Sequence, residues 1–345
     1  MKNYTYLKIY AELRDQIIHG AYPLHSTLHS KRILAKQFGV SRITIEHALN
    51  LLKEEGYIES LERVGYKVIY NQETIFPVSN LIDTPIPTTI KENKIPYSIY
   101  AKAVRTVLTI YGEKVLEKSP MQGLYELRVA IKNYLARSRN LFVDEEQIVI
   151  GAGSESFYSR IVELFGRSIV YGVEYPGYEK VEKEYLQQGV RVDRLKLGND
   201  GLLQTELQRT PAKILHVTPF ISYPSLVTAS ASKRRAYLEW ANKNDAILVE
   251  DDYASEFIST ARVLNTLFSL DTEGRVLYIN SFHKTISSSL RMGYIVLPKQ
   301  KVKTYLNVWK HHSCQVSTLD QLIVTYLLNS GAFERNLNRL RRRHM

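Results

Sequence analysis

The sequence predicts an α/β protein with a small helical domain at the N-terminus and a larger domain built on a mostly parallel sheet. The chain has 345 residues, a length that suits about two domains of ordinary size. Apolar residues recur at helical spacing in residues 6–56, and short apolar runs alternate with helix-length amphipathic segments from residue 146 onward. Alternation of strand and helix indicates a parallel sheet with helices on both faces.

Composition excludes several classes of protein. Hydrophobic residues make up 44% and charged residues 23% of the chain, which excludes a disordered or collagen-like protein. No apolar run approaches the roughly 20 residues that span a bilayer, and the N-terminus lacks an apolar secretion signal. The single cysteine, Cys314, fits a reducing compartment, so we expect a cytoplasmic protein. The formal net charge of +11 suits a polyanionic partner without identifying one.

The N-terminal domain, residues 1–70, is predicted to begin with one amphipathic helix. Ile9, Leu13 and Ile17 form an apolar stripe at four-residue spacing. Gly20 follows the stripe and is expected to end the helix.

Two short helices joined by a glycine turn are predicted next. The second helix begins after Ser30 and is broken by Gly39, and the third follows Ser41. The predicted core residues of the second helix are Ile33, Leu34 and Phe38. Those of the third helix are Ile45, Ala48, Leu49 and Leu52. This arrangement is typical of a helix-turn-helix, and residues 57–69 would add a two-stranded wing.

The start of the third helix is the predicted DNA-recognition end. A recognition helix places its N-terminal residues in the major groove, where Arg42 could contact a guanine edge or a phosphate. Lys31 and Arg32 open the second helix and could contact the DNA backbone. The candidate DNA-binding residues are Lys31, Arg32, Ser41, Arg42, Thr44 and Gly65 near the wing tip. Periodicity alone allows equally well a three-helix bundle with solvated basic residues.

This domain resembles the winged helix of GntR-family repressors. The resemblance runs from Leu28-His29-Ser30-Lys31-Arg32 through Gly39-Val40-Ser41-Arg42-Ile43-Thr44 to Glu55-Gly56-Tyr57-Ile58. The proline-glycine usual in the family before the second helix is replaced by Leu24-His25. The resemblance implies a domain that binds double-stranded DNA.

Residues 71–98 are predicted to form a linker. Pro77, Pro85, Pro87 and Pro96 lie among Thr, Asn and Ser with no sustained period. Such a segment is typical of a semi-extended tether.

Polar residues follow the apolar runs of the larger domain, residues 99–345. The runs are residues 148–150, 169–171, 214–217, 247–249 and 276–279. Ligands of parallel sheets bind at the carboxyl ends of the strands, so one edge would collect the amides of Gly151–Glu155, the acids of Glu250–Asp252, Lys284 and Arg291. This set suits pyridoxal phosphate, which needs a lysine for an imine, a carboxylate at its ring nitrogen and donors at its phosphate.

The same residues resemble a fold-type I aminotransferase, and their order resembles the MocR subgroup of GntR regulators, which joins a winged helix to that fold. The matching stretches are Pro120–Arg128, Gly151–Glu155, Tyr175–Tyr178, Glu250–Phe257 and Ser281–Gly293. The resemblance implies that Lys284 forms the Schiff base, that Asp251 pairs with the pyridine nitrogen and that Tyr253 bonds the ring hydroxyl. The other implied contacts are Tyr178 on the ring and, at the phosphate, Ser281, Arg291 and the amides of Ser154 and Glu155.

Other signals are set aside. Gly151-Ala152-Gly153 imitates a dinucleotide-binding motif, but Ser156 stands where the third glycine belongs. His311-His312-Ser313-Cys314 offers metal ligands, yet adjacent histidines on a helix point to different faces, so no metal is predicted.

The sequence departs from the family pattern at a few places. Pro224-Ser225-Leu226 replaces the usual Pro-Thr-Gly turn, and His283 stands where serine is usual before the lysine. Relatives continue beyond the position of Met345 with a segment that completes the small subdomain and supplies an arginine for a substrate carboxylate. The sequence therefore names no carboxylate anchor.

The resemblance implies a transcription regulator that binds operator half-sites as a homodimer and senses pyridoxal phosphate or its adduct with an amino compound. An active aminotransferase with an accessory DNA-binding domain is the alternative, because a sensor and a catalyst of this type share their first steps. A plain repressor whose larger domain binds no cofactor is a third hypothesis.

Overall fold

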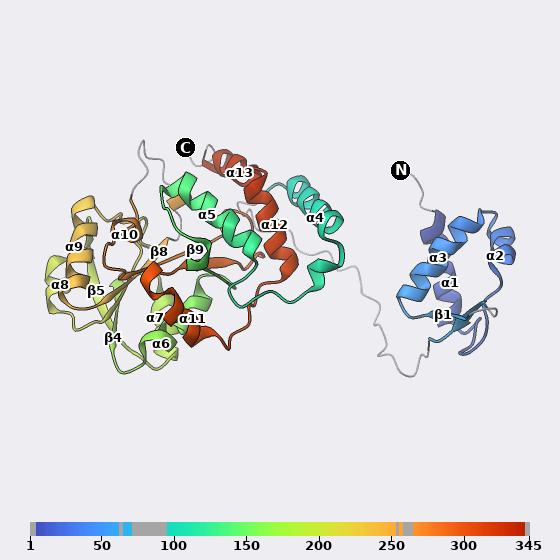
Figure 1. The fold of residues 1–345 in the computed structure, drawn as a ribbon, viewed down its shortest axis with the longest axis horizontal. Helices are drawn as coiled ribbons and strands as arrows, with labels where there is room; N and C mark the ends of the chain where they lie inside the picture. The colour runs from blue at the N-terminus through green and yellow to red at the C-terminus, as the bar shows by residue number, and fades with distance from the viewer. Residues whose placement is uncertain (1–4, 62–64, 71–94, 253–254, 258–264, 342–345) are drawn as a thin grey trace. The chain divides into compact units, whose positions relative to one another are not determined.

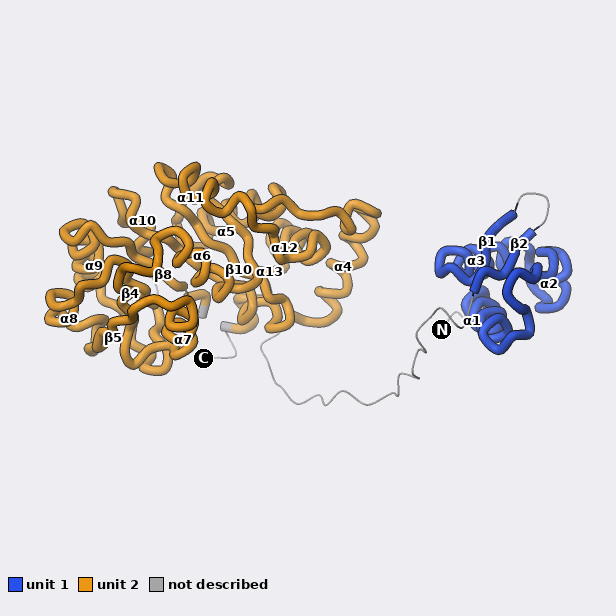
Figure 2. Tube along the Cα trace, turned by 90° about the horizontal axis from the view of Figure 1, so that it is seen from below, with its two compact units in different colours: residues 1–89 blue, residues 90–345 orange. Residues whose placement is uncertain are grey.

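The chain forms two compact units, residues 1–89 and residues 90–345 (Figure 2). The computed structural model describes residues 5–61, 65–70, 95–252, 255–257 and 265–341. Most of the predicted linker lies outside the described residues. Tyr253, the predicted partner of the ring hydroxyl, lies outside them as well.

Unit 1 contains three helices and a two-stranded antiparallel ribbon in its described part, as predicted. The elements are α1 (Thr5–Ile18), α2 (Lys31–Phe38), α3 (Arg42–Glu54), β1 (Ile58–Leu61) and β2 (Gly65–Val68). The ribbon pairs Ile58 with Val68 and Leu61 with Gly65. The apolar stripe of α1 packs against the buried face of α3, so the three helices and the ribbon share one core.

The turn between α2 and α3 follows from three residues. The Ser30 side chain accepts a hydrogen bond from the Ile33 amide and begins α2. Gly39 ends α2 in the left-handed conformation, with φ of 64°, where a side chain would be strained. Ser41 then caps α3 by accepting from the Thr44 amide. The prediction that Ile33 is a core residue is wrong: its side chain is 52% exposed, because Leu34, Ala35 and Phe38 form the side of the short helix that packs against the core.

Unit 2 is built on a sheet of eight strands in the described residues. The strands are β3 (Ile148–Gly151), β4 (Val170–Tyr175), β5 (Arg191–Gly198), β6 (Gly201–Leu202), β7 (Ile214–Val217), β8 (Ile247–Asp252), β9 (Val276–Ser281) and β10 (Gly293–Val296). Their order is β3-β10-β9-β8-β7-β4-β5-β6. Strands β5, β4, β7, β8 and β9 run parallel, whereas β10 pairs antiparallel with β3 and β9.

Helices cover both faces of this sheet (Figure 1). The α-helices of unit 2 are α4 (Tyr97–Tyr111), α5 (Tyr125–Arg139), α6 (Glu155–Phe165), α7 (Glu179–Gln187), α8 (Gln204–Arg209), α9 (Ala231–Lys243), α10 (Leu267–Leu270), α11 (Val302–Trp309), α12 (Thr318–Asn329) and α13 (Ala332–Arg341). The 3-10 turns are η1 (Gly112–Leu116), η2 (Glu145–Gln147), η3 (Ser255–Phe257) and η4 (Lys299–Lys301).

Successive residues of one strand enter different cores, as strand geometry requires. Ile148 and Ile150 pack in the core that includes α4, α5, α12 and α13. Val149 packs instead with α6, α7 and α11. No helix within the described ranges is long and apolar enough to cross a membrane.

Candidate functional site

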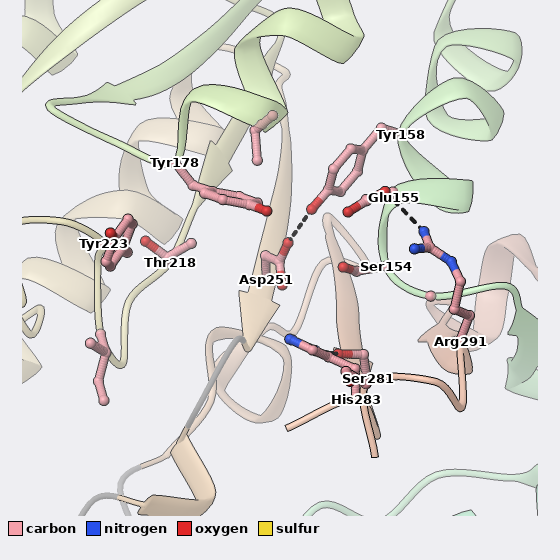
Figure 3. A pocket seen from close by; sticks show the side chains of 14 residues that line it. Ser154, Glu155, Tyr158, Tyr178, Thr218, Tyr223, Asp251, Ser281, His283 and Arg291 are labelled. Atoms are coloured by element: carbon pink, nitrogen blue, oxygen red, sulfur yellow. Dashed lines mark hydrogen bonds and ion pairs between the residues drawn. The ribbon is translucent and has the colours of Figure 1, made fainter. Parts of the chain in front are cut away.

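A pocket of about 120 Å³ lies at the carboxyl ends of strands β8 and β9 and the start of α6 (Figure 3). It contains six of the residues predicted from the sequence, which are Ser154, Glu155, Tyr178, Asp251, Ser281 and Arg291. Other lining residues were not predicted, among them Tyr158, Thr218, Tyr223, His283 and Ser288. Residues more than 130 positions apart in the chain thus meet because parallel strands end at one edge of the sheet.

Asp251 is held from behind by two aromatic side chains. It stands near the end of β8 and is 5% exposed. The Tyr158 hydroxyl donates a 2.7 Å hydrogen bond to Asp251 Oδ2, as Figure 3 shows. His216 Nε2 lies 3.4 Å from the same oxygen, and His216 Nδ1 lies 3.0 Å from the Tyr185 hydroxyl. Both contacts converge on Oδ2, which leaves Oδ1 for other partners.

The other end of the pocket combines backbone amides with a cation. Glu155 is the first residue of α6, and the N–H groups at a helix start attract anions. Ser281 ends β9, and its Oγ lies 3.2 Å from His283 Nδ1. Gly293 lets β10 approach this end, because a Cβ there would lie 2.8 Å from the Asn280 carbonyl oxygen and 3.1 Å from the Ser154 amide nitrogen.

The Glu155 carboxylate lies between two cations at this end of the pocket. Lys180 Nζ is 2.5 Å from Glu155 Oε1. Arg291 Nη2 is 3.3 Å from Glu155 Oε2, the second dashed contact in Figure 3. Of the described residues that line the pocket, Arg291 is the one lysine or arginine.

Lys284 lies in the loop after β9 and does not line the pocket itself. Its side chain is half-buried, and burial lowers the pKa of its amine. The Tyr223 hydroxyl acts in the opposite direction on that pKa, and Tyr223 does line the pocket. The amine is therefore electrostatically coupled to a group of the pocket wall.

Two tyrosines form the aromatic wall of the pocket. Tyr178 precedes α7, and its ring meets Tyr223 edge to face, with ring centroids 6.4 Å apart. Both rings also border a larger adjoining cavity of about 860 Å³, which Glu174 and His216 line as well. The Glu174 carboxylate accepts hydrogen bonds from Ser222 Oγ and from the Thr218 amide, which fixes the loop after β7 to the end of β4.

A buried ionic cluster lies behind the ends of β8 and β9. Arg139 Nε is 3.5 Å from Asp252 Oδ2, and its Nη2 is 3.7 Å from Glu256 Oε1. The Tyr278 hydroxyl donates to Asp252 Oδ2 at 2.6 Å, and Asn280 Nδ2 donates to Glu256 at 3.0 Å. This cluster joins α5 to the residues that follow Asp251 and precede Ser281 in their strands.

In unit 1 the predicted DNA-binding residues lie at the starts of α2, α3 and β2. Arg32, Ser41 and Arg42 are exposed. Ser41 Oγ also lies 2.9 Å from Thr44 Oγ1, so the two hydroxyls form one cap. Gly65 begins β2 with φ of 115°.

Lys31 already has partners in this unit. Its Nζ lies 2.6 Å from Glu46 Oε1 on the exposed side of α3 and 5.7 Å from the centre of the Tyr66 ring. The Glu46 carboxylate on α3 therefore neutralises the charge of Lys31, one of the residues predicted to contact the DNA backbone.

Comparisons with known proteins cover nearly the whole chain. The family described as "Bacterial regulatory proteins, gntR family" matches residues 5–68, and "Aminotransferase class I and II" matches residues 91–345. The "Probable rhizopine catabolism regulatory protein MocR" of Rhizobium meliloti is 26% identical over 97% of this chain and 74% of its own length. The chain belongs to the MocR subgroup of GntR-family transcription regulators.

Two further relatives of this MocR-subgroup regulator also match nearly the whole chain. An uncharacterised HTH-type transcriptional regulator of Bacillus subtilis, YdeL, is 28% identical over 98% of this chain and 76% of its own length. The HTH-type pyridoxine biosynthesis transcriptional regulator PdxR of Corynebacterium glutamicum is 27% identical over 96% of this chain and 74% of its own.

Solved aminotransferases share the fold of unit 2. An archaeal alanine:glyoxylate aminotransferase has a TM-score of 0.65 and 25% identity, and the match covers 70% of this chain and 62% of that one. The α-aminoadipate aminotransferase LysN of Thermus thermophilus, complexed with N-(5'-phosphopyridoxyl)-L-leucine, has a TM-score of 0.64 and 25% identity, with 72% and 64% covered. The MocR-subgroup chain thus spans less than two thirds of the length of these enzymes.

The pocket residues that sequence reasoning missed have weak local signals. Tyr158 follows Ser154 by one helical turn, and this spacing could have placed its ring over the helix start. Thr218 follows the apolar run of residues 214–217 and meets the same strand-end criterion as Asp251. Nothing in the sequence marks His216, because an apolar neighbour on each side is equally typical of a core histidine.

Proposed function

We propose that this chain is a cytoplasmic, DNA-binding transcription regulator whose larger unit binds pyridoxal phosphate through Lys284 and senses the cofactor or its adduct with an amino compound. The main support is the meeting of Asp251, Ser281 and Arg291 with the first amides of α6 in one pocket. On a chain that also has a GntR-type winged helix, this pocket fits a sensor joined to a DNA-binding domain.

The donor set of the pocket fits each part of this cofactor. A protonated pyridine nitrogen matches the Asp251 carboxylate, whose Oδ2 is already bonded by Tyr158. A phosphate matches Arg291, the Ser281 hydroxyl and the amides of Ser154 and Glu155 at the start of α6. Tyr178 offers an aromatic face for the ring, and Tyr253 remains the predicted partner of the ring hydroxyl.

The chemistry divides between the cofactor and the chain. When bound, pyridoxal phosphate supplies an aldehyde that condenses with amines and a ring that withdraws electrons. Lys284 supplies the nucleophilic amine. Because burial lowers the pKa of Lys284, a larger share of this amine is neutral at a given pH than in an exposed lysine. Asp251 would hold the proton at the pyridine nitrogen, since a nearby carboxylate favours the charged ring.

Unit 1 would supply the DNA contacts. Arg42 is proposed to contact a guanine edge or a phosphate at the major groove. The remaining proposed contacts are Lys31, Arg32, Ser41, Thr44 and Gly65. We propose a homodimer, because paired winged helices match paired operator half-sites. A small amino compound would then shift the population of DNA-binding arrangements, by no more than its difference in affinity for them.

The test combines a spectrum with a selection. Full-length protein is mixed with pyridoxal phosphate, its absorbance is recorded, and its mass is measured after borohydride reduction. The same protein is used to select duplexes from a randomised DNA pool with and without the cofactor. We expect a covalent mass increase on Lys284 and a selected sequence whose affinity depends on the cofactor. A colourless protein of unchanged mass would contradict the cofactor assignment, and failure to select any sequence would contradict the regulator assignment.

An active aminotransferase with an accessory DNA-binding domain is the second candidate. It is favoured by the match of residues 91–345 to aminotransferase class I and II. Turnover of amino donors and keto acids by the purified protein distinguishes the two. Brisk transamination without sequence-selective DNA binding would support the enzyme.

A further inference from the structure

Glu155 brings opposite electrostatic features to one end of the pocket. Its backbone N–H belongs to the start of α6, where an anion is attracted. Its side chain is itself an anion and lies within 3.3 Å of the Arg291 guanidinium. Figure 3 shows this carboxylate beside the Arg291 guanidinium, joined to it by a dashed line.

Lys180 of α7 completes a row of three charges. Lys180 Nζ is 2.5 Å from Glu155, closer than the guanidinium is. The hydrogen bond to Glu155 raises the pKa of Lys180, so this amine stays charged. Two cations and one carboxylate leave a local charge of +1, whereas the cations alone would offer +2 to an incoming dianion.

We propose that Glu155 competes with the cofactor phosphate for Arg291 and thereby weakens cofactor binding, and that Lys180 limits this effect by holding the carboxylate. The proposal rests on the proposed function, since it concerns the phosphate of the same cofactor. A carboxylate and a phosphate that share one guanidinium repel each other, and the repulsion lowers the affinity of the second anion. A regulator with weakened binding responds to cofactor over a higher range of concentration.

The exposure of the three side chains sets the expected size of the change in cofactor affinity. The side chains of Glu155, Lys180 and Arg291 are 28%, 43% and 66% exposed, so solvent and salt screen their interactions in part. Removal of the Glu155 charge is therefore expected to tighten binding by roughly 5- to 30-fold, between the effects typical of exposed and of buried pairs. The gain is expected to shrink as ionic strength rises.

The proposal is tested with full-length Glu155→Gln, which keeps the backbone amide and the side-chain shape. Dissociation constants are measured by absorbance titration for pyridoxal phosphate and for pyridoxal, which has no phosphate. We expect tighter binding of pyridoxal phosphate and no change for pyridoxal. Lys180→Gln is expected to weaken binding of pyridoxal phosphate, because the carboxylate is then left to Arg291 alone.

A second ion pair on α7, the helix that carries Lys180, serves as the control. Glu179 and Lys183 of α7 are 2.7 Å apart, and neither lines the pocket. Glu179→Gln removes an equal charge and is expected to leave both dissociation constants unchanged. If Glu155→Gln leaves binding of pyridoxal phosphate unchanged or weaker, or changes both ligands equally, the inference is wrong. If the unaltered protein forms no borohydride-stable adduct, the proposed function itself fails.

Discussion

The carboxylate of Asp251 shows how neighbouring residues can orient one functional group. Tyr158 and His216 both approach its Oδ2, and Tyr185 in turn holds the His216 ring. Burial raises the pKa of Tyr158 well above its ordinary value, and the charge of Asp251 adds to that shift, so the hydroxyl keeps its proton and remains a donor. With Oδ2 engaged, Oδ1 is the oxygen that would meet the ring nitrogen of the proposed cofactor.

The first prediction concerns the reactive amine. Lys284→Ala is expected to abolish the borohydride-stable adduct with pyridoxal phosphate, because Lys284 is the one amine to which the proposal assigns the imine. In the unaltered protein, the adduct is expected to form at lower pH than with an exposed lysine, since burial lowers the pKa of Lys284 and leaves more of it neutral. The measurement is absorbance against pH followed by mass analysis.

Lys299→Ala is the control for that measurement. This lysine is 75% exposed and pairs with Asp144 at 2.8 Å, so its loss is expected to leave the adduct unchanged. Retention of a full adduct in Lys284→Ala would refute the assignment of the lysine.

The second prediction concerns Arg42 at the exposed start of α3. Arg42→Ala is expected to weaken operator binding by about 1–3 kcal/mol and to relax the preference at one base pair if the side chain contacts a guanine. Titration of selected and scrambled duplexes measures both effects. An equal loss on every duplex would mark a phosphate contact instead. Lys53→Ala, at the exposed far end of the same helix, is the control and is expected to change little.

Parts of the site could be predicted from the sequence, because the proposed function requires a particular type of residue at the end of a strand. Asp251 and Ser281 follow apolar runs, and Arg291 comes seven residues after Lys284. The structure brings Asp251, Ser281 and Arg291 to one pocket. Contacts that depend on side-chain direction could not be predicted. Neither the approach of Glu155 to Arg291 nor that of His216 to Asp251 leaves a pattern along the chain, because each pair is far apart in sequence.

At the scale of elements, the helix α5 is joined to strand β8 by a buried guanidinium. Arg139 contacts Asp252 and Glu256, and all three side chains are at most 8% exposed. Arg139→Met is expected to destabilise unit 2 by about 3–5 kcal/mol, because two carboxylates then remain in a low-dielectric site without their cation. Chemical unfolding of the full chain followed by circular dichroism measures the loss.

Arg137 provides the comparison on the same helix. Its guanidinium pairs with Glu334 at 2.8 Å but is 56% exposed. Arg137→Met is expected to cost under about 1 kcal/mol, as for other exposed ion pairs. Similar losses for the two variants would show that the buried cluster has no special role in stability.

The connection from β8 to α10 makes stability depend on pH. Glu250 is fully buried and accepts hydrogen bonds from the amides of Leu267 and Phe268, at 2.8 and 2.9 Å. Burial raises the pKa of Glu250 to about 8, above its value in the unfolded chain. Between those two pKa values the folded protein holds a proton that the unfolded chain has lost, so the free energy of unfolding falls as pH rises toward 8.

Thermal unfolding between pH 5.5 and pH 8.5 checks this direction. The expected decline is at most roughly 1.4 kcal/mol per pH unit from one group. Burial also raises the pKa of Glu174, which acts in the same sense. Glu250→Gln is expected to flatten the profile, although it costs one hydrogen bond at every pH. Stability that rises steadily over this range would contradict the assignment.

Secondary structure was predictable where one period dominates. The stripe of Ile9, Leu13 and Ile17 lies in helix α1, and the runs 214–217 and 276–279 begin strands β7 and β9. Strand β10 was missed because it enters the sheet antiparallel, after a loop without a helix, so no alternation marks it. The exposed Ile33 was misplaced because an apolar side chain in a short helix fits the period even when it faces solvent.

At the scale of the whole molecule, the proposed function requires a free-energy link between cofactor binding in unit 2 and DNA binding in unit 1. Such a link is reciprocal: if pyridoxal phosphate changes the affinity for an operator by some factor, the operator changes the affinity for pyridoxal phosphate by the same factor. A factor of about 5–150 is typical of such coupling.

Both of these reciprocal effects on affinity can be measured on the full chain. The operator dissociation constant is determined with and without pyridoxal phosphate, and the pyridoxal phosphate dissociation constant with and without operator. Glu155→Gln is expected to shift both cofactor constants together and to leave the coupling factor unchanged, because its charge acts on the phosphate alone. Lys284→Ala is expected to remove or reduce the coupling, because the proposed signal depends on the covalent link. Equal operator affinity with and without saturating cofactor would mean that unit 2 binds its ligand without informing unit 1, and regulation would then need a different effector.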